Sequence, residues 1–205
     1  MEPLMTTARD LMLVAMDVKP VRPVGQGDLS LALAGAEVID LVGAGAVAVD
    51  GDLIVPGTSA APDDPLLADA ASSLVRAAPY ERVEDWLWRR GQGLAAAYAA
   101  RLEADGLVGR SRQGRLSFRS ADTRPLDSPA RGRATERWEA DEPVLAVLGW
   151  AAGLREEPAD AFAGPPGDAV GTVLAAVGDA VTELEAVRQR RSIEDAAFDN
   201  IWRAP

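Results

Sequence analysis

Carboxylates and arginines are the side chains with which this chain could do chemistry, because it contains no histidine and no cysteine. Their absence excludes a Ser-His-Asp triad, a cysteine nucleophile and metal sites built on histidine or thiolate. The adjacent carboxylates Asp63-Asp64 and Glu156-Glu157 could act as general acid and base. However, the first pair precedes a proline at a predicted helix start, and the second falls in a polar loop. We therefore expect no enzyme, no metal site and no cofactor.

Arginine is concentrated in the middle of an acidic chain. The formal net charge is −11, yet residues 76–137 carry thirteen arginines against eight acidic residues. A guanidinium can donate paired hydrogen bonds to a phosphate or a carboxylate, so this segment is where an external anion would bind. Alternatively, these arginines pair with the acidic residues of the flanking segments. The sequence leaves both alternatives open.

Hydrophobic spacing predicts that helices position these groups. Apolar residues recur at i, i+3 and i+4, which is typical of helices packed on one face. Asp28 and Asp64 are predicted to cap two of these helices at their N-termini. The predicted helices cover 4–17, 28–42, a segment after Pro65, a segment around Trp86, 94–105, 130–140, 143–153 and 167–201.

Two segments alternate between apolar and polar residues and predict short β-hairpins. Residues 46–55 turn at Asp50-Gly51. In the second, Leu107-Val108 leads into a polar turn at 111–114 and a strand at 115–119. Its expected surface consists of Arg110, Arg112, Arg115, Phe118 and Arg119. The predicted fold is mainly α, a single globular helical domain over residues 1–205 with two short β-hairpins.

The N-terminal segment does not have the pattern of a secretory signal. Glu2, Arg9 and Asp10 interrupt its apolar residues. Elsewhere the sequence contains no uncharged apolar run of about 18 residues, the length that a membrane-spanning helix requires. We expect a cytoplasmic protein, with any membrane contact peripheral and at the inner face.

The order of four segments resembles the Golgi phosphoprotein 3 family, in particular its bacterial members. These segments are ARDLMLVAMD, LALAGAEVIDLVGAGAVAV, the pair DDPLLADAASSL and VEDWL, and RLEADGLVGRSRQGRLSF. The resemblance implies an all-helical domain with a hairpin and no catalytic activity. It also implies a peripheral membrane or adaptor role, since eukaryotic members bind phosphatidylinositol 4-phosphate.

The family's lipid-head-group pocket uses a tryptophan in the loop before the second helix, an arginine within that helix, and two arginines three residues apart in the helix before the hairpin. The residues at these positions here are Gly25, Ala34, Gln92 and Ala95. The pocket residues are therefore not retained. Arg22, Arg89 and Arg90 lie nearby in the sequence and are candidates for an alternative anion or lipid-head-group site.

The resemblance also suggests partners. They are an anionic lipid or membrane surface, a protein partner, and a second copy of the chain bound through the 107–119 hairpin. An alternative function is a winged-helix-like DNA-binding regulator built from residues 64–119, with Arg112 and Arg115 in the wing. The alanine-rich helix and the acidic flanks disfavour this alternative, and nucleic acid is not an expected partner.

Overall fold

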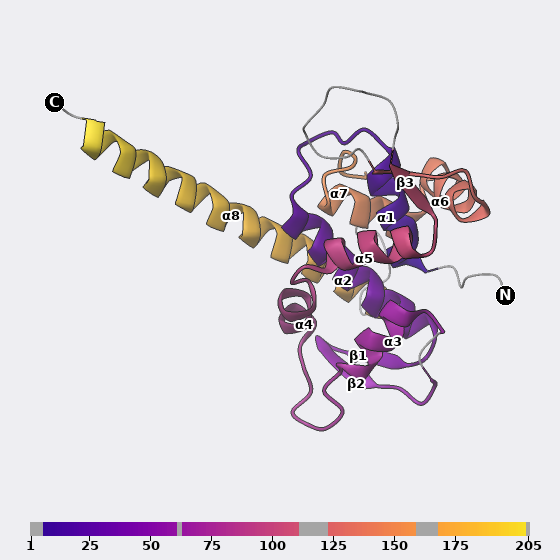
Figure 1. Ribbon diagram of the computed structural model, residues 1–205. Helices are drawn as coiled ribbons and strands as arrows, with labels where there is room; N and C mark the ends of the chain where they lie inside the picture. Colours follow the sequence, from indigo (N-terminus) through magenta and orange to yellow (C-terminus); the bar gives the residue numbers. More distant parts are fainter. Residues whose placement is uncertain (1–5, 61–62, 111–122, 159–167, 204–205) are drawn as a thin grey trace.

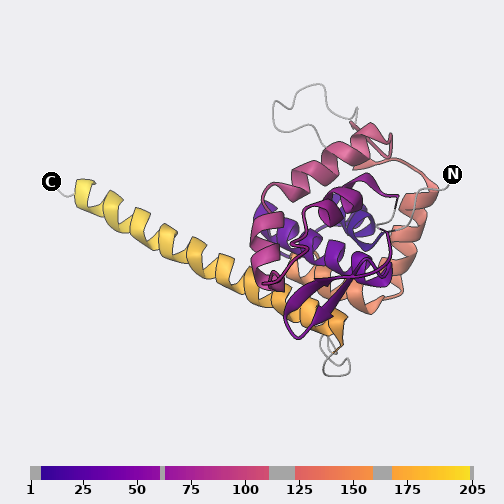
Figure 2. The same ribbon diagram turned by 90° about the horizontal axis from the view of Figure 1, so that it is seen from below.

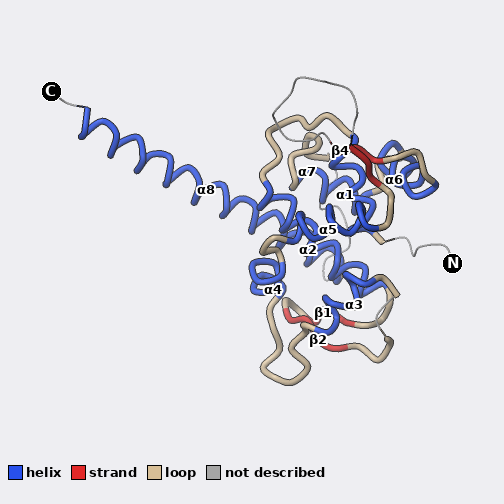
Figure 3. Tube along the Cα trace, viewed as in Figure 1, coloured by secondary structure: helices blue, strands red, loops and turns tan. Residues whose placement is uncertain are grey.

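The computed structural model describes residues 6–60, 63–110, 123–158 and 168–203, and it confirms a mainly helical fold with two small antiparallel hairpins (Figures 1 and 3). The helices are α1 (Thr7–Asp17), α2 (Gln26–Gly43), α3 (Pro65–Ser72), α4 (Val83–Arg90), α5 (Leu94–Ala104), α6 (Pro129–Glu139), α7 (Pro143–Ala151) and α8 (Ala169–Arg203). The strands are β1 (Val47–Asp50), β2 (Leu53–Pro56), β3 (Val108–Arg110) and β4 (Thr123–Pro125).

Helix α2 is the centre of the fold. Almost all of its residues from Asp28 to Leu41 are buried, and α1, α4, α5, α7 and α8 pack around it (Figure 2). Gly35 allows α8 to approach closely, because a Cβ at this position would clash with Val177. The indole nitrogen of the buried Trp86 donates a 3.3 Å hydrogen bond to the carbonyl of Ala34. α2 therefore ties α4 and α8 to the same core.

The two predicted helix caps have different outcomes. The carboxylate of Asp64 accepts hydrogen bonds from the amides of Leu66 and Leu67, which confirms it as the N-cap of α3. Asp28 is not a cap, since α2 begins two residues earlier, at Gln26, and Gly25 is its N-cap. The Asp28 side chain instead accepts hydrogen bonds from Arg188 of α8. The cap prediction was wrong because this distant partner is not visible in the local sequence.

The first hairpin is confirmed, with β1 paired to β2 and Gly51 at a φ of +61° in the turn. In the second hairpin, β3 pairs with β4, which lies later in the chain than the predicted return strand. The predicted turn and strand, together with Arg112, Arg115, Phe118 and Arg119, lie outside the described residues. Arg110 ends β3 opposite Thr123. The pairing of Arg110 with Thr123 fixes the register at the base of this hairpin.

Helix α8 spans 35 residues and extends well beyond the other helices (Figures 1 and 2). Its first half packs in the core through Val173, Val177 and Ala180. Its C-terminal half extends away from the rest of the structure in both views. The predicted helix over 167–201 is thus confirmed in extent, while the projection was not expected.

Candidate functional site

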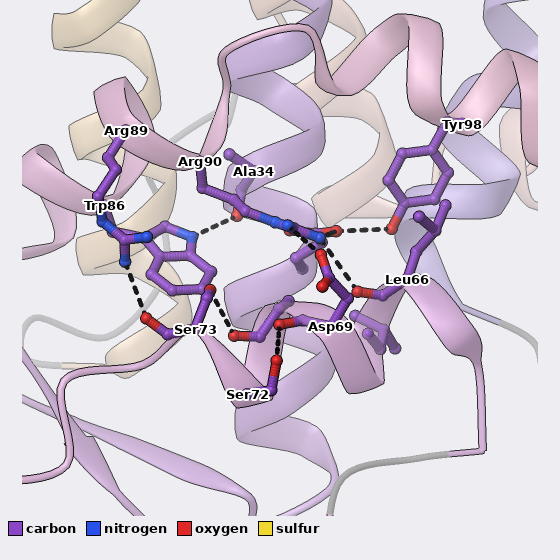
Figure 4. A network of polar contacts seen from close by, with 12 residues as sticks. Ala34, Leu66, Asp69, Ser72, Ser73, Trp86, Arg89, Arg90 and Tyr98 are labelled. Carbon is purple, nitrogen blue, oxygen red and sulfur yellow. Dashed lines mark hydrogen bonds and ion pairs between the residues drawn. The ribbon is translucent and has the colours of Figure 1, made fainter.

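Arg90 lies at the centre of a polar network between α2, α3, α4 and α5 (Figure 4). Its guanidinium donates two hydrogen bonds, of 2.7 and 3.0 Å, to the carboxylate of Glu37, which is fully buried in α2. It donates two more to the Asp69 carboxylate at 2.6 Å and to the Leu66 carbonyl at 3.1 Å. The side chain of Arg90 is only 13% exposed. The internal carboxylates therefore occupy the positions that an external anion would need.

Glu37 also accepts a 3.1 Å hydrogen bond from the hydroxyl of Tyr98, a buried residue of α5. Burial raises the pKa of Glu37, and the hydrogen bonds and charge of Arg90 oppose this rise. Burial likewise raises the pKa of Tyr98, and the nearby Glu37 charge adds to it. Each polar group in this network is held by another, so the arrangement serves as a tie between four helices.

Arg89 points to the other side of α4. It forms a two-pronged ion pair with Glu81, with both distances at 2.7 Å. It also donates a hydrogen bond to the Ser73 carbonyl (Figure 4). Its guanidinium also lies 5.0 Å from the centre of the Trp86 ring. The structure therefore gives Arg89 and Arg90 separate sets of partners and does not combine them in one site.

Arg22 lies at the opposite end of α2, close to the C-terminus of α7. It donates a 2.7 Å hydrogen bond to the Ala151 carbonyl, where a cation interacts favourably with the helix dipole. It also forms a 3.5 Å ion pair with Asp28, whose carboxylate is bound at 2.8 Å by Arg188. Two arginines thus share one buried carboxylate. Arg22 does not lie with Arg89 and Arg90, and anion binding by these three residues stays a prediction.

Other arginines of the basic segment also pair with internal acids. Across the described residues, these pairs are Arg82 with Asp52, Arg101 with Asp105, Arg131 with Asp17, and Arg137 with Asp10 and Glu142. Several of the acids belong to the flanking segments. The alternative in which arginines of the basic segment pair with acidic residues of the flanks is therefore confirmed for Arg82, Arg131 and Arg137, whereas Arg101 pairs within the segment.

A second buried polar cluster, around the start of α1, was missed by the sequence reasoning. Asp40 accepts hydrogen bonds from the amides of Thr7 and Ala8, at 2.9 and 3.1 Å, and so caps α1 from another helix. Burial raises the pKa of Asp40 to about 6, although the hydrogen bonds from Thr7 and Ala8 act to lower it. Arg9 bridges Asp64 and Asp105 at the same end of the fold. Asp40 follows an apolar run, and nothing in that pattern indicates a cap for a helix far away in sequence.

The positions that correspond to the family's pocket differ in their surroundings. Ala34 and Ala95 are buried in packing, whereas Gln92 lines a cavity of about 240 Å³ between α2, α4, α5 and α8. The other residues of its lining are small, apolar or uncharged, namely Gln26, Gly27, Ser30, Leu31, Trp88, Gly91, Gly93, Ala96 and Leu184. Since this lining includes no cation, the cavity lacks the charge-assisted hydrogen bonds that a phosphate monoester requires.

The base of the second hairpin has a different character. Arg124 on β4 is exposed, and Leu126, two residues later, is 48% exposed. Leu126 extends the pairing through a 2.8 Å hydrogen bond from its amide to the Leu107 carbonyl. An exposed cationic and an exposed apolar residue thus lie two positions apart along the chain, and Arg124 is paired with Gly109.

Neither a metal site nor a membrane-spanning helix was found in the part of the chain that the structure describes. No group of three or more acidic side chains there could hold a metal ion. No described helix combines the length and the apolar character needed to cross a membrane.

Comparison with family models identifies a match over most of the chain. The family model described as Golgi phosphoprotein 3 (GPP34) matches residues 8–198. A search of curated proteins found no match to this chain.

Proposed function

Because this chain belongs to the Golgi phosphoprotein 3 family, we propose that it is a non-enzymatic protein that binds peripherally to anionic membrane surfaces. The contact surface is the second hairpin with its base. The membrane face is the cytoplasmic one, where anionic lipids attract basic segments.

The exposed pair of Arg124 and Leu126 is the observation that carries this proposal. A surface that combines cationic and apolar side chains suits the boundary between head groups and acyl chains. The adjoining sequence extends this composition, since residues 108–119 contain Arg110, Arg112, Arg115, Arg119 and Phe118 but no acidic residue. Each basic residue near an anionic surface contributes about 1 kcal/mol, so this segment alone could supply useful affinity.

The lipid preference follows from the uncharged cavity beside Gln92. A phosphoinositide should bind no better than another lipid of the same charge, because the family's pocket arginines are replaced. We therefore propose recognition of negative surface charge in place of recognition of a particular head group. A protein partner and self-association through the 107–119 hairpin are compatible with the same surface and form part of this proposal.

The test is vesicle flotation of the full chain. The vesicles contain neutral lipid alone, neutral lipid with phosphatidylserine, or neutral lipid with phosphatidylinositol 4-phosphate at matched total charge. We expect binding to both charged vesicles, little difference between them, and a decrease with added salt. Replacing Arg112 and Arg115 by glutamine should reduce binding about 30-fold, which corresponds to two lost contributions.

The matched control replaces Arg82 and Arg190, which are exposed and lie on other parts of the structure, by glutamine. This variant has the same net charge as the hairpin variant and should bind nearly as well as the unaltered chain. No binding to charged vesicles at low salt would exclude the membrane function. Equal losses in both variants would exclude the hairpin as the contact surface.

The structure gives no support to the DNA-binding alternative. The predicted recognition region over 81–105 is interrupted between α4 and α5. Helix α5 directs Leu94, Tyr98 and Leu102 into the core, and its exposed positions are mainly alanine. Such a face offers few side chains that could reach base edges in the major groove.

A further inference from the structure

Helix α8 carries a seven-residue repeat that continues past the core. The first and fourth positions of this repeat are the ones that face a partner helix in a coiled coil. These positions are Val173, Val177, Ala180, Leu184, Val187, Arg191, Glu194, Phe198 and Ile201. Val173, Val177 and Ala180 are buried in the core of this chain, which shows that the repeat marks a packing face. Leu184 still contacts the core beside Gly27 and Trp88, and Arg188 still pairs with Asp28 of α2. Beyond Arg188, the helix has no neighbour in the described structure (Figures 1 and 2).

The repeat changes character along the projecting part of the helix. Leu184 and Val187 are half-buried and apolar, Arg191 and Glu194 are exposed and charged, and the next two positions of the repeat are again apolar residues, Phe198 and Ile201. The order is therefore two apolar residues, a cation, an anion and two apolar residues. When two such helices lie antiparallel, the cation of each therefore faces the anion of the other, and the apolar residues face apolar residues.

We propose that α8 forms an antiparallel helix pair with α8 of a second copy of this chain, about a two-fold axis between Ser192 and Ile193. In this alignment Arg191 lies opposite Glu194 of the second copy, and Val187 lies opposite Phe198. Leu184, at the edge of the apolar cavity beside Trp88, lies opposite Ile201. Each of these contacts occurs twice, as a symmetric interface requires.

The charges along α8 favour a second copy of this helix as its partner, and they favour the antiparallel orientation of the two helices. Between residues 185 and 192 there are three arginines and one acidic residue, and between 193 and 203 there are three acidic residues and one arginine. Arg188 pairs with Asp28 of its own chain, which leaves Arg190 and Arg191 for the partner helix. Antiparallel pairing places the basic half of one helix on the acidic half of the other. Parallel pairing would place like charges together at Arg191 and at Glu194, which is unfavourable. An anionic membrane is a poorer fit, since the acidic half would be repelled.

The arrangement also explains how the projecting helix is stabilised. An isolated helical segment of this length gains little stability in water without tertiary packing. Pairing supplies that packing to both copies at once and covers the half-buried Leu184 and Val187. This interface is separate from the 107–119 hairpin and does not depend on the proposed membrane function.

The test is the mass of the full chain in solution, measured by light scattering and by sedimentation velocity over a wide range of concentration. We expect a species of twice the 21.5 kDa chain mass. Arg191→Glu places two like-charged contacts in the interface, and so does Glu194→Arg. Each should weaken the dimer about 100-fold or more. The double variant Arg191→Glu/Glu194→Arg restores opposite charges and should restore the dimer.

Gln189→Glu is the control, because it adds a negative charge at an exposed position of α8 that lies opposite the contact face of the repeat. It should leave the dimer intact. Circular dichroism of every variant should show an unchanged helical fold, since the altered side chains are exposed. A monomeric unaltered chain would overturn the proposal. So would a dimer that both single charge reversals leave intact, or a double variant that stays monomeric.

Discussion

Replacing Arg90 by methionine tests whether this arginine serves the fold or remains available to an external anion. Methionine keeps much of the apolar stem and removes the charge. The carboxylate of Glu37, which is completely buried, would lose its ion pair and two hydrogen bonds. Removing one member of a buried pair typically costs about 3–5 kcal/mol, because the other charge is left uncompensated.

The other contacts of Arg90 add little to this loss of folding free energy. Asp69 is 64% exposed, so its ion pair contributes at most about 1 kcal/mol. We therefore expect Arg90→Met to lower the free energy of unfolding by about 4 kcal/mol at pH 7. For a chain of this size that corresponds to a fall of roughly 10 °C in Tm. Urea denaturation followed by tryptophan fluorescence measures the loss, since Trp86 lies buried next to the network.

The loss should depend on pH in a defined direction. Burial already raises the pKa of Glu37, and removal of Arg90 raises it further. Between the unfolded and the folded pKa, the folded state binds more protons, so the stability of the variant increases as the pH falls. The difference between Arg90→Met and the unaltered chain should therefore be smaller at pH 5 than at pH 7.

Two further variants make the result decisive. Arg89→Met removes a neighbouring arginine that is 45% exposed and should cost about 1 kcal/mol. Glu37→Gln combined with Arg90→Met removes both charges and should recover much of the lost stability. If Arg90→Met costs no more than Arg89→Met at pH 7, the reasoning fails. Arg90 would then be free to hold an external anion.

Other consequences of the packing can be tested with single substitutions. Burial raises the pKa of Asp40 from 3.8 to about 6, so this group makes the fold more stable as the pH falls from 7 towards 4. Asp40→Asn should remove that gain, about 3 kcal/mol, in denaturation series across pH. Gly35→Ala should destabilise by about 1–2 kcal/mol, because the added methyl meets Val177. Gly171→Ala, where nothing lies within 4 Å, should stabilise by up to about 1 kcal/mol.

Specific results would contradict these predictions. An Asp40→Asn variant with the same pH profile as the unaltered chain would mean that this carboxylate titrates alike in both states. A Gly35→Ala variant as stable as Gly171→Ala would mean that α2 and α8 can separate at no cost.

The predicted elements agree well with the structure where the signal is local. Asp64 followed by Pro65 marks a helix start, and Asp50-Gly51 marks a hairpin turn, whose two turn residues in the structure are Gly51 and Asp52. Both patterns rest on the dihedral preferences and hydrogen bonds of a few neighbouring residues, so they need no knowledge of the remaining fold. The family resemblance was also visible in the order of the apolar segments, and it is confirmed over residues 8–198.

The sequence by itself determined the helical fold class and excluded histidine and cysteine chemistry. It also located the excess of arginine in the middle of the chain. The tertiary structure decided which charges meet. Arg90 and Glu37 are 53 residues apart, and Arg188 and Asp28 are 160 apart. Such pairs depend on how helices pack, and composition alone cannot distinguish an arginine held by a buried carboxylate from one that is exposed to a ligand.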